Sequence, residues 1–301
     1  EPAVPALRPY QKDARAAVRR ALETYRSTLC VMPTGTGKTH VMGALASDWR
    51  PKGRVLVLTH RIELLTQTAA KLTDEWGLSV GVEAGAEHVD PKRPPRVVVA
   101  STATLTYARR REAFQPDAFA LVIVDEGHHA TAASYRKILA YFATAKVVLL
   151  TATPDRADGV GLGHVCESVA YALGLATAIR DGWLVPIYQR DVVVEDVHLE
   201  GVRVTRGDLD DRALEAQYLQ EKALHGVARP LVELTPGMPT MVFTAGVKQA
   251  HALAATINRY AGEGRAAAAS GDTAPIVRDA ILADYRAGRV QYLVNCGLWV
   301  E

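Results

Sequence analysis

The sequence predicts a doubly wound α/β fold with parallel sheets, on three observations. Short runs rich in Val, Leu and Ile alternate with stretches of helical spacing along the 301 residues. The runs are continuous, as expected for strands that are buried on both faces of a parallel sheet. A glycine-rich segment follows the first run and precedes a helical stretch, which is where such folds place an anion-binding loop.

Five buried strands are predicted in the first half of the chain, at residues 28–32, 54–59, 96–100, 119–124 and 146–151. Helical stripes lie between them. Ala14, Val18 and Leu22 form one apolar face, and Leu65, Ala69 and Leu72 form another. This strand–helix alternation is typical of an α/β layer.

The alternation resumes after a turn signal at residues 235–239. Strands are predicted at 240–244, 265–269 and 290–295, and helices at 247–260 and 275–286. Three strands are few for an independent α/β domain. We therefore expect a first domain over residues 1–184, a linker or small insertion over 185–234, and a second domain over 235–301 that is incomplete at its C-terminal end.

Composition places the chain among globular proteins. Apolar residues make up 49% and charged residues 23%, which excludes wholesale disorder and collagen-like structure. No apolar run approaches the roughly 20 residues of a membrane span, and the first ten residues lack the apolar core of a signal peptide. The three cysteines lie far apart, which favours a reducing, cytoplasmic setting. A net charge of +2 neither demands nor excludes nucleic acid.

The segment PTGTGKT at residues 33–39 has the features of a phosphate-binding loop. Glycines let the backbone curl so that consecutive N–H groups point at an anion, and the positive end of the next helix adds to the attraction. Lys38 is expected to reach the terminal phosphates of ATP, and the Thr39 hydroxyl to hold Mg²⁺. Met32 stands where the general motif has glycine, so the match is to a shorter form. The predicted nucleotide-binding residues of this loop are Thr34, Gly35, Thr36, Gly37, Lys38 and Thr39.

Two carboxylates follow a predicted buried strand in the segment DEGHH at residues 125–129. Mg²⁺ is commonly held by one or two carboxylates together with phosphate oxygens, which suits Asp125. Glu126 suits the base that orients and deprotonates an attacking water. The adjacent histidines invite a zinc site, but no cysteine or third ligand follows at metal spacing. His128 is instead expected to hydrogen-bond the acidic pair to the next segment.

Together these motifs resemble superfamily 2 helicases and translocases, of the DEAH-like type found in phage and bacterial proteins and similar to XPB-type and restriction-motor ATPases. The resemblance rests on segments in the family's order: LRPYQ at 7–11, PTGTGKT at 33–39, LTHRIELLTQ at 58–67, ASTATL at 100–105, DEGH at 125–128, TATP at 151–154, MVFT at 241–244 and VNCGLWVE at 294–301. Each segment outside the phosphate loop is a weak signal, but their order and spacing together are specific.

The resemblance implies two RecA-like domains that couple ATP hydrolysis to movement along a nucleic-acid backbone. It implies that Gln11 reads the edge of the adenine base, and that Thr151 and Thr153 relay the nucleotide state to the nucleic acid. The backbone contacts that it implies are Arg61, Ser101 and Thr102 in the first domain and Thr244 and Lys248 in the second. The family's later arginine motif is not found in these 301 residues, which is a second reason to expect an incomplete second domain.

Three functions stay open: an ATP-dependent helicase or translocase, a small-molecule kinase, and an ATP-binding clamp or regulatory subunit without robust hydrolysis. The kinase is disfavoured because nothing matches an acceptor site under a lid, and because the Asp-Glu pair suits water as the acceptor. DNA is the expected partner, with RNA as the alternative, by analogy with relatives of the DEGH segment. No membrane partner is expected, and the sequence predicts no oligomeric state.

Overall fold

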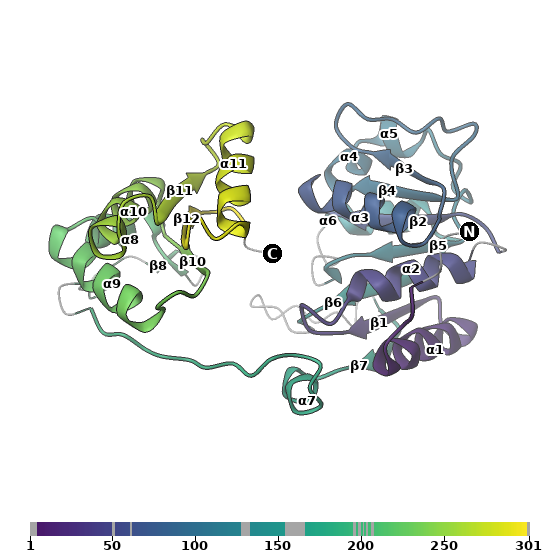
Figure 1. The fold of residues 1–301 in the computed structure, drawn as a ribbon. Helices are drawn as coiled ribbons and strands as arrows, with labels where there is room; N and C mark the ends of the chain where they lie inside the picture. Colours follow the sequence, from purple (N-terminus) through teal and green to yellow (C-terminus); the bar gives the residue numbers. More distant parts are fainter. Residues whose placement is uncertain are drawn as a thin grey trace. The chain divides into compact units, whose positions relative to one another are not determined.

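The computed structural model describes residues 5–49, 52–60, 62–127, 133–153, 166–194, 197, 200, 202, 204–205 and 208–299. The chain divides into two compact units, Glu1–Ile187 and Tyr188–Glu301, whose helices and strands are labelled in Figure 1. Each unit has a hydrophobic core of its own. Among the described helices, none combines the length and apolar character that a membrane crossing requires.

Within the described residues, the first unit holds a sheet of seven parallel strands in the order β3-β4-β2-β5-β6-β1-β7. The strands are β1 (Ser27–Val31), β2 (Val55–Thr59), β3 (Val80–Glu83), β4 (Val97–Ser101), β5 (Leu121–Val124), β6 (Lys146–Thr151) and β7 (Ser168–Ala172). Every residue of β1, β2, β4 and β5 is buried, which confirms the predicted parallel sheet. The edge strands β3 and β7 are mostly half-exposed, and the sequence does not predict them.

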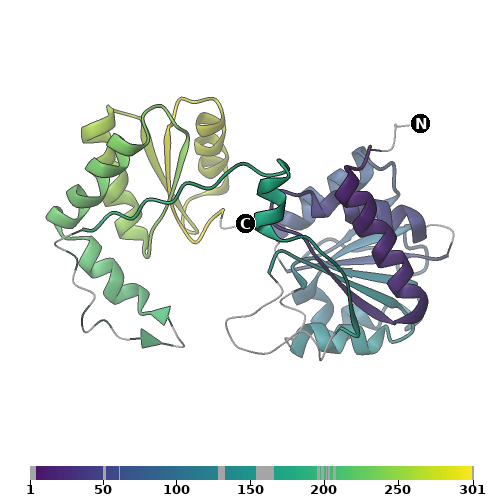
Figure 2. The same ribbon diagram turned by 90° about the horizontal axis from the view of Figure 1, so that it is seen from below.

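Helices cover both faces of this sheet. They are α1 (Pro9–Thr24), α2 (Lys38–Trp49), α3 (Ile62–Asp74), α4 (Thr102–Thr106), α5 (Ala108–Arg111), α6 (Ala133–Tyr141) and α7 (Leu175–Arg180). One core cluster joins α1, α2 and α3 to one face, and a second cluster joins α4 and α6 to the other. Figure 2 shows the purple and blue helices and the teal helices on opposite sides of the sheet, which confirms the doubly wound arrangement.

The apolar stripe predicted for α1 is confirmed. Ala14, Val18 and Leu22 are all buried, because residues four apart share one face of a helix. On the other side, Arg15 donates to Asp48 at the end of α2, and this hydrogen bond raises the pKa of the Arg15 guanidinium. α1 is thereby fixed to both the sheet and α2, which matters for the loop that begins α2.

Among its described residues, the second unit holds a parallel sheet in the order β10-β12-β11. Its elements are the short hairpin β8 (Val204–Thr205) and β9 (Asp208–Leu209), strands β10 (Thr240–Phe243), β11 (Ala266–Ser270) and β12 (Tyr292–Cys296), and helices α8 (Asp211–Tyr218), α9 (Glu221–Leu234), α10 (Val247–Ala261) and α11 (Pro275–Arg286). The strands and helices predicted between residues 240 and 295 are thus present, with small shifts at their ends.

The segment expected to be a linker or small insertion, residues 185–234, contains two helices in its second half. Residues 211–234 form α8 and α9, and Ala228 of α9 is fully buried against Leu253 and Ile257 of α10 in the core of unit 2. The division of the chain into two compact units falls between Ile187 and Tyr188. Pro230 inside α9 hides this helix from a sequence-based prediction, because proline usually ends one.

β5 and β6 come unusually close just beyond the end of β5. A Cβ atom placed on Gly127 would lie 2.7 Å from Cβ of Leu149 and 3.2 Å from its Cα. Real Cβ atoms do not approach each other this closely in packed interiors, so the backbone here leaves no room for a methyl group. The glycine of the DEGH segment is therefore a requirement of packing between these two strands.

We expect Gly127→Ala to lower the free energy of unfolding of unit 1 by about 1–3 kcal/mol, because the added methyl group forces the strands apart. Denaturant unfolding followed by tryptophan fluorescence measures this, since Trp49, Trp76 and Trp183 all lie in unit 1. Gly174→Ala is the matched control, because its new Cβ would approach no described atom closer than 3.8 Å. Equal midpoints for wild type and Gly127→Ala would contradict the packing account.

Candidate functional site

The phosphate loop lies between β1 and α2, at the carboxyl edge of the sheet. Gly35 and Gly37 have φ angles of 85° and 80°, which other residues rarely adopt. Within the described part of the chain, the N–H groups of Gly35, Gly37, Lys38 and Thr39 donate no hydrogen bond. The loop therefore presents a group of unpaired donors at the positive end of a 12-residue helix, an arrangement suited to binding phosphate.

Side chains of α1 hold this loop in place. Tyr10 Oη and Gln11 Nε2 each donate to the Thr36 carbonyl at 2.8 Å. Thr36 Oγ1 donates to the Pro33 carbonyl at 2.6 Å. The side-chain carbonyl of Gln11 accepts from the Arg8 N–H at 2.9 Å, so both ends of this buried amide are engaged. Gln11 thus positions the phosphate loop, a role that the sequence does not predict.

Two side chains from far along the sequence close over the loop. Trp183 packs against Tyr10 with ring centroids 5.0 Å apart. A Cβ atom on Gly35 would lie 3.2 Å from Cδ2 of Leu184, so this leucine lies against the loop. The N–H groups of Trp183 and Leu184 donate to the Ala178 carbonyl at 2.9 and 3.0 Å, which turns the chain back after α7. No motif marks these residues, and only their aromatic and apolar character could have suggested them.

The acidic pair leaves the carboxyl end of β5. The Asp125 N–H donates to the Leu58 carbonyl of β2 at 2.9 Å, which extends the strand pairing up to the turn. Glu126 has a φ of 49°, in the left-handed region that a residue with a side chain seldom occupies. Such backbone strain persists when the surrounding structure imposes it, and it gathers at functional sites.

The phosphate loop and the acidic pair meet through Lys38 and Glu126. Lys38 Nζ lies 2.9 Å from Glu126 Oε1, and the two side chains are 11% and 16% exposed. Among the described atoms, none offers buried Nζ an acceptor with good hydrogen-bond geometry, so the contact is an ion pair and the ammonium keeps its donors. A buried charge without a partner is costly, so each group offsets part of the cost of burying the other.

The oxygen atoms beside this pair fit a hard divalent cation. Thr39 offers a hydroxyl from the first turn of α2, and Asp125 offers a carboxylate from the end of β5; both are half-buried. Mg²⁺ prefers oxygen ligands and is usually held by few protein groups together with phosphate and water. The two residues predicted as metal ligands therefore have suitable chemistry at this edge.

The thiol nearest the loop in sequence belongs to Cys30 of β1. Burial raises the pKa of this thiol to about 12, so it stays protonated at neutral pH. A protonated thiol is a poor nucleophile and a poor metal ligand. The reactive groups near this loop are therefore Lys38, the threonine hydroxyls and the two carboxylates.

Thr151 ends β6, which lies between β1 and β5 in the sheet. Its carbonyl accepts from the Met32 N–H at 2.9 Å, immediately before the phosphate loop. Its hydroxyl donates to the Thr153 carbonyl at 3.0 Å and accepts from the Thr153 N–H at 3.2 Å. The structure thus places Thr151 beside the loop, buried, and Thr153 next to it, exposed.

The residues predicted to contact nucleic acid are dispersed. Ser101 and Thr102 are both buried at the end of β4, and Thr102 Oγ1 donates to the Thr59 carbonyl at 3.2 Å. Thr244 and Lys248 belong to unit 2; the Thr244 hydroxyl contacts the Asn295 carbonyl, and Lys248 is exposed. Arg61 and His128 lie outside the described residues.

A shallow hollow of about 520 Å³ lies at the ends of β2 and β4. His60, Thr102 and Thr106 line it together with Tyr107, whose side chain is 71% exposed. Base stacking on an exposed aromatic ring is a common contact with single-stranded nucleic acid. The sequence does not single out Tyr107, although it follows directly on the predicted contacts of this edge.

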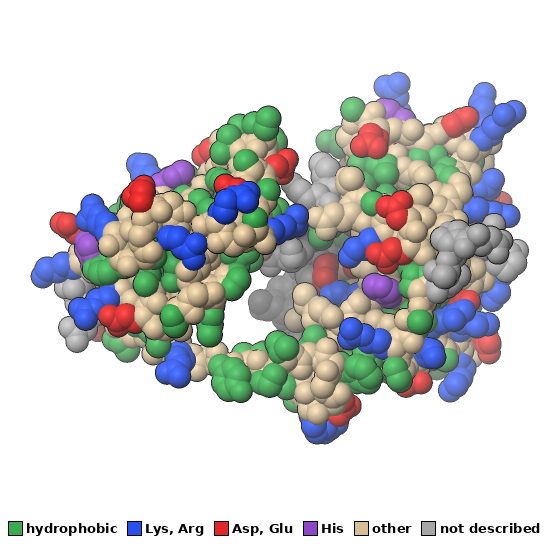
Figure 3. Space-filling view, viewed as in Figure 1, with side chains coloured by type: hydrophobic (Ala, Val, Ile, Leu, Met, Phe, Trp, Pro, Cys, Tyr) green, Lys and Arg blue, Asp and Glu red, His purple; other side chains and the backbone are tan. Residues whose placement is uncertain are grey.

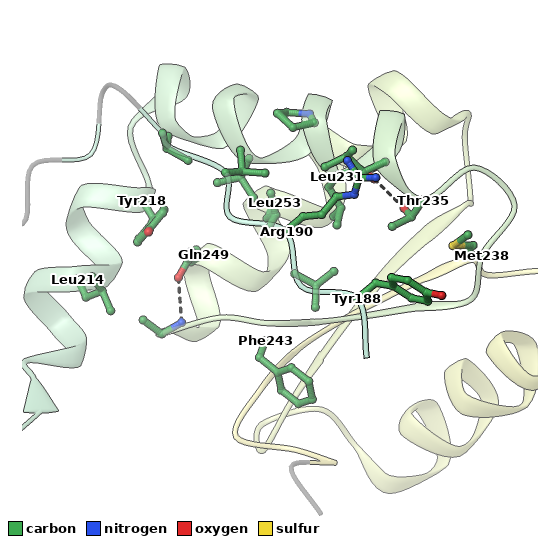
Figure 4. Close-up of a pocket in the computed structure, with 17 residues that line it drawn as sticks. Tyr188, Arg190, Leu214, Tyr218, Leu231, Thr235, Met238, Phe243, Gln249 and Leu253 are labelled. Atoms are coloured by element: carbon green, nitrogen blue, oxygen red, sulfur yellow. Dashed lines mark hydrogen bonds between the residues drawn. The ribbon is translucent and has the colours of Figure 1, made fainter. Parts of the chain in front are cut away.

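Unit 2 has an apolar groove of about 910 Å³. Figure 4 shows Tyr188 and Arg190 on the extended segment that borders the groove, with Leu231 of α9, Leu253 of α10 and Phe243 of β10 around it. This lining suits apolar contacts, and the described residues that form it include no Asp or Glu. The groove therefore lies outside the candidate nucleotide site.

Comparison with known proteins is consistent with this geometry. A Saccharomyces cerevisiae protein whose name assigns it as an ATP-dependent helicase, IRC3, is 30% identical over 99% of this chain and 45% of its own length. The DNA 3'-5' translocase XPB2 of Sulfurisphaera tokodaii is 33% identical over 51% of this chain and 32% of its own. The chain spans about half the length of the curated yeast relatives that it matches.

Among solved structures, a fragment assigned as the HsdR subunit of a type I restriction enzyme from Vibrio vulnificus YJ016 matches with a TM-score of 0.68. It is 22% identical and covers 96% of this chain and 54% of its own. This likeness confirms the predicted RecA-like α/β fold.

A family model described as "Type III restriction enzyme, res subunit" matches residues 5–156, which is just over half of the chain and includes both the phosphate loop and the acidic pair. The chain therefore belongs to this family and is a superfamily 2 helicase-like protein, as its motifs predict.

Proposed function

We propose that the chain is the ATP-driven motor part of a nucleic-acid helicase or translocase that acts on DNA. The observation that carries the proposal is the contact between Lys38 and Glu126, which joins a phosphate loop to a water-activating carboxylate. The names of the relatives support it, since one is assigned as an ATP-dependent helicase and another is a DNA translocase.

In this proposal the ATP phosphates lie against the unpaired N–H groups of Gly35, Gly37, Lys38 and Thr39. Lys38 leaves Glu126 and contacts the terminal phosphates, because a polyphosphate offers it more negative charge. Thr34 and Thr36 complete the loop, and Gln11 contacts the edge of the adenine base while its amide supports Thr36. The positive end of α2 adds to the attraction for phosphate.

Thr39 and Asp125 are the proposed ligands of Mg²⁺, which when bound neutralises charge that develops on the phosphates. Glu126, released by Lys38, orients a water molecule and accepts its proton. His128 is proposed to hydrogen-bond this acidic pair to the following segment. The left-handed backbone at Glu126 sets the direction in which its side chain leaves the main chain.

Nucleic acid is proposed to lie along the carboxyl edge of the first sheet. Arg61, Ser101 and Thr102 are the proposed contacts there, with Thr244 and Lys248 as contacts from unit 2. Backbone contacts carry little base specificity. Thr151 and Thr153 are proposed to couple the two sites, and the hydrogen bond from Met32 to Thr151 supports this role.

The proposed function is tested by measuring ATP hydrolysis with and without DNA or RNA. We expect DNA to raise the rate, because a motor couples turnover to its track. Stimulation by RNA alone would shift the substrate assignment. ATP binding without turnover under all conditions would contradict the motor and favour an ATP-binding clamp or regulatory subunit.

Lys38→Ala should reduce ATP turnover by about 10²-fold or more, because the transition state loses its main cationic contact. Steady-state phosphate release measures the effect. Lys12→Ala is the matched control, since this lysine is exposed on α1 and should leave the rate unchanged. Wild-type turnover in Lys38→Ala would remove the phosphate loop from the mechanism.

Glu126→Gln should lower hydrolysis about 10²–10⁴-fold, the usual contribution of a general base, while ATP binding is retained. Affinity should not fall, because the carboxylate that competes with phosphate for Lys38 is gone. A fluorescent ATP analogue reports binding, and phosphate release reports turnover. Glu23→Gln on the exposed side of α1 serves as the control. If Glu126→Gln hydrolysed ATP normally, another group would have to be the base.

A further inference from the structure

A second concave surface lies at the amino edge of the first sheet, opposite the phosphate loop. It is a hollow of about 680 Å³ at the starts of β2, β4 and β5. Because the strands are parallel, one strand length, about 16 Å for five residues, separates the two edges. The nucleotide site and this hollow therefore have no lining residue in common.

The hollow is strongly cationic. Among the described residues that line it, the charged ones are Lys52, Arg54, Arg93, Arg96 and Asp117, a local balance of +3. Over the face shown in Figure 3, by contrast, Lys and Arg side chains are interspersed with Asp and Glu, in keeping with a net charge of +2 for the whole chain. The charge of the hollow thus differs from the mixed charge pattern of the face shown in Figure 3.

These cations have no acidic partner within the described part of the chain. The ion pairs of unit 1 elsewhere neutralise arginines such as Arg15, paired with Asp48, and Arg110, paired with Glu83. No comparable pair forms in the hollow, although Asp117 lies in its lining. Like charges gathered without partners repel one another, which an anionic ligand would relieve.

The floor of the hollow is rigid. The Val55 N–H donates to the Arg96 carbonyl at 2.9 Å, and the Ala120 N–H donates to the Arg54 carbonyl at 2.8 Å. A Cβ atom on Gly53, where φ is 150°, would lie 2.7 Å from Cβ of Ala120. Glycine and alanine thus keep the floor open, and strand hydrogen bonds fix the backbone that carries the cations.

Two of the four cationic side chains, those of Arg54 and Lys52, make further contacts beside the hollow. Arg54 Nε donates to the Pro94 carbonyl at 3.3 Å, and Pro94 and Pro95 stiffen the loop that carries Arg93 and Arg96. Lys52 Nζ lies 4.7 Å from the centre of the Trp49 ring, a contact that orients the ammonium and leaves its charge available. Binding here would cost less ordering entropy than binding to free surface side chains.

We propose that this hollow is a second phosphodiester-binding site, which holds a stretch of the nucleic acid away from the carboxyl edge. The inference rests on the proposed function, which supplies a long polyanion as the substrate. Lysine and arginine contacts to phosphates are independent of base sequence, and a moving motor requires such contacts. The site would hold the strand at a fixed place on the first unit while the nucleotide state changes at the opposite edge.

The test is the double variant Arg93→Glu/Arg96→Glu, with Lys12→Glu/Arg20→Glu on the exposed side of α1 as the control of equal charge change. Anisotropy of a labelled single-stranded DNA is measured over a range of salt concentrations. If each arginine contacts one phosphate, the slope of log K against log salt should fall by about 1.4, and affinity near 0.1 M salt by roughly 25-fold. The control should change both values far less.

Three results would overturn the inference. The first is an unchanged slope and affinity in the double variant that retains the wild-type melting temperature. The second is equal loss in the control, which would indicate a general charge effect. The third is displacement of the DNA by inorganic phosphate or polyglutamate at constant ionic strength, together with loss of that competitor's binding in the double variant. This result would assign the hollow to a small anion or an acidic protein.

The wild-type chain separates this inference from the proposed function. If wild type binds DNA and DNA stimulates its ATP hydrolysis, the proposed function stands whatever the double variant does. If wild type binds no nucleic acid at any salt concentration, the proposed function fails and the second site fails with it.

Discussion

The ion pair between Lys38 and Glu126 is the contact on which the candidate site depends. β6 lies between β1 and β5, so the ends of these two strands stand about 10 Å apart. The long side chains of Lys38 and Glu126 reach toward each other across that gap, and Lys38 Nζ lies 2.9 Å from Glu126 Oε1. The shorter side chain of Asp125 stays near its own strand. The strand order therefore helps to decide which of the two carboxylates contacts Lys38 of the loop.

Much of this site could be predicted from the sequence because its chemistry is local. PTGTGKT contains in seven residues the glycines, the lysine and the hydroxyl that a phosphate loop needs, and DEGH places both carboxylates directly after a strand. The central strands could be predicted equally well, because burial on both faces makes them continuously apolar. In each case, neighbours in the chain determine the structure.

The remaining features depend on contacts between distant residues, which one sequence does not reveal. The ring of Trp183 packs on that of Tyr10, although most of the sequence of unit 1 separates the two residues. Strand β7 pairs with β1 at the edge of the sheet, and its side chains are half-exposed. The hydroxyl of Thr102 donates to the Thr59 carbonyl on the neighbouring strand, a contact that the local motif does not reveal. α9 contains a proline and is stabilised by packing on α10. Tertiary packing, which the local sequence does not reveal, sets the contacts at these positions.

The two edges of the first sheet differ in charge for a geometric reason. Helices that follow parallel strands point their positive ends toward the carboxyl edge and their negative ends toward the amino edge. A negative helix end accounts for a cation such as Lys52, close after the end of α2. It does not account for Arg93 and Arg96, which lie between two strands, β3 and β4. The positive charge at this edge thus exceeds what the helix ends stabilise, and that excess is what an anionic strand would neutralise.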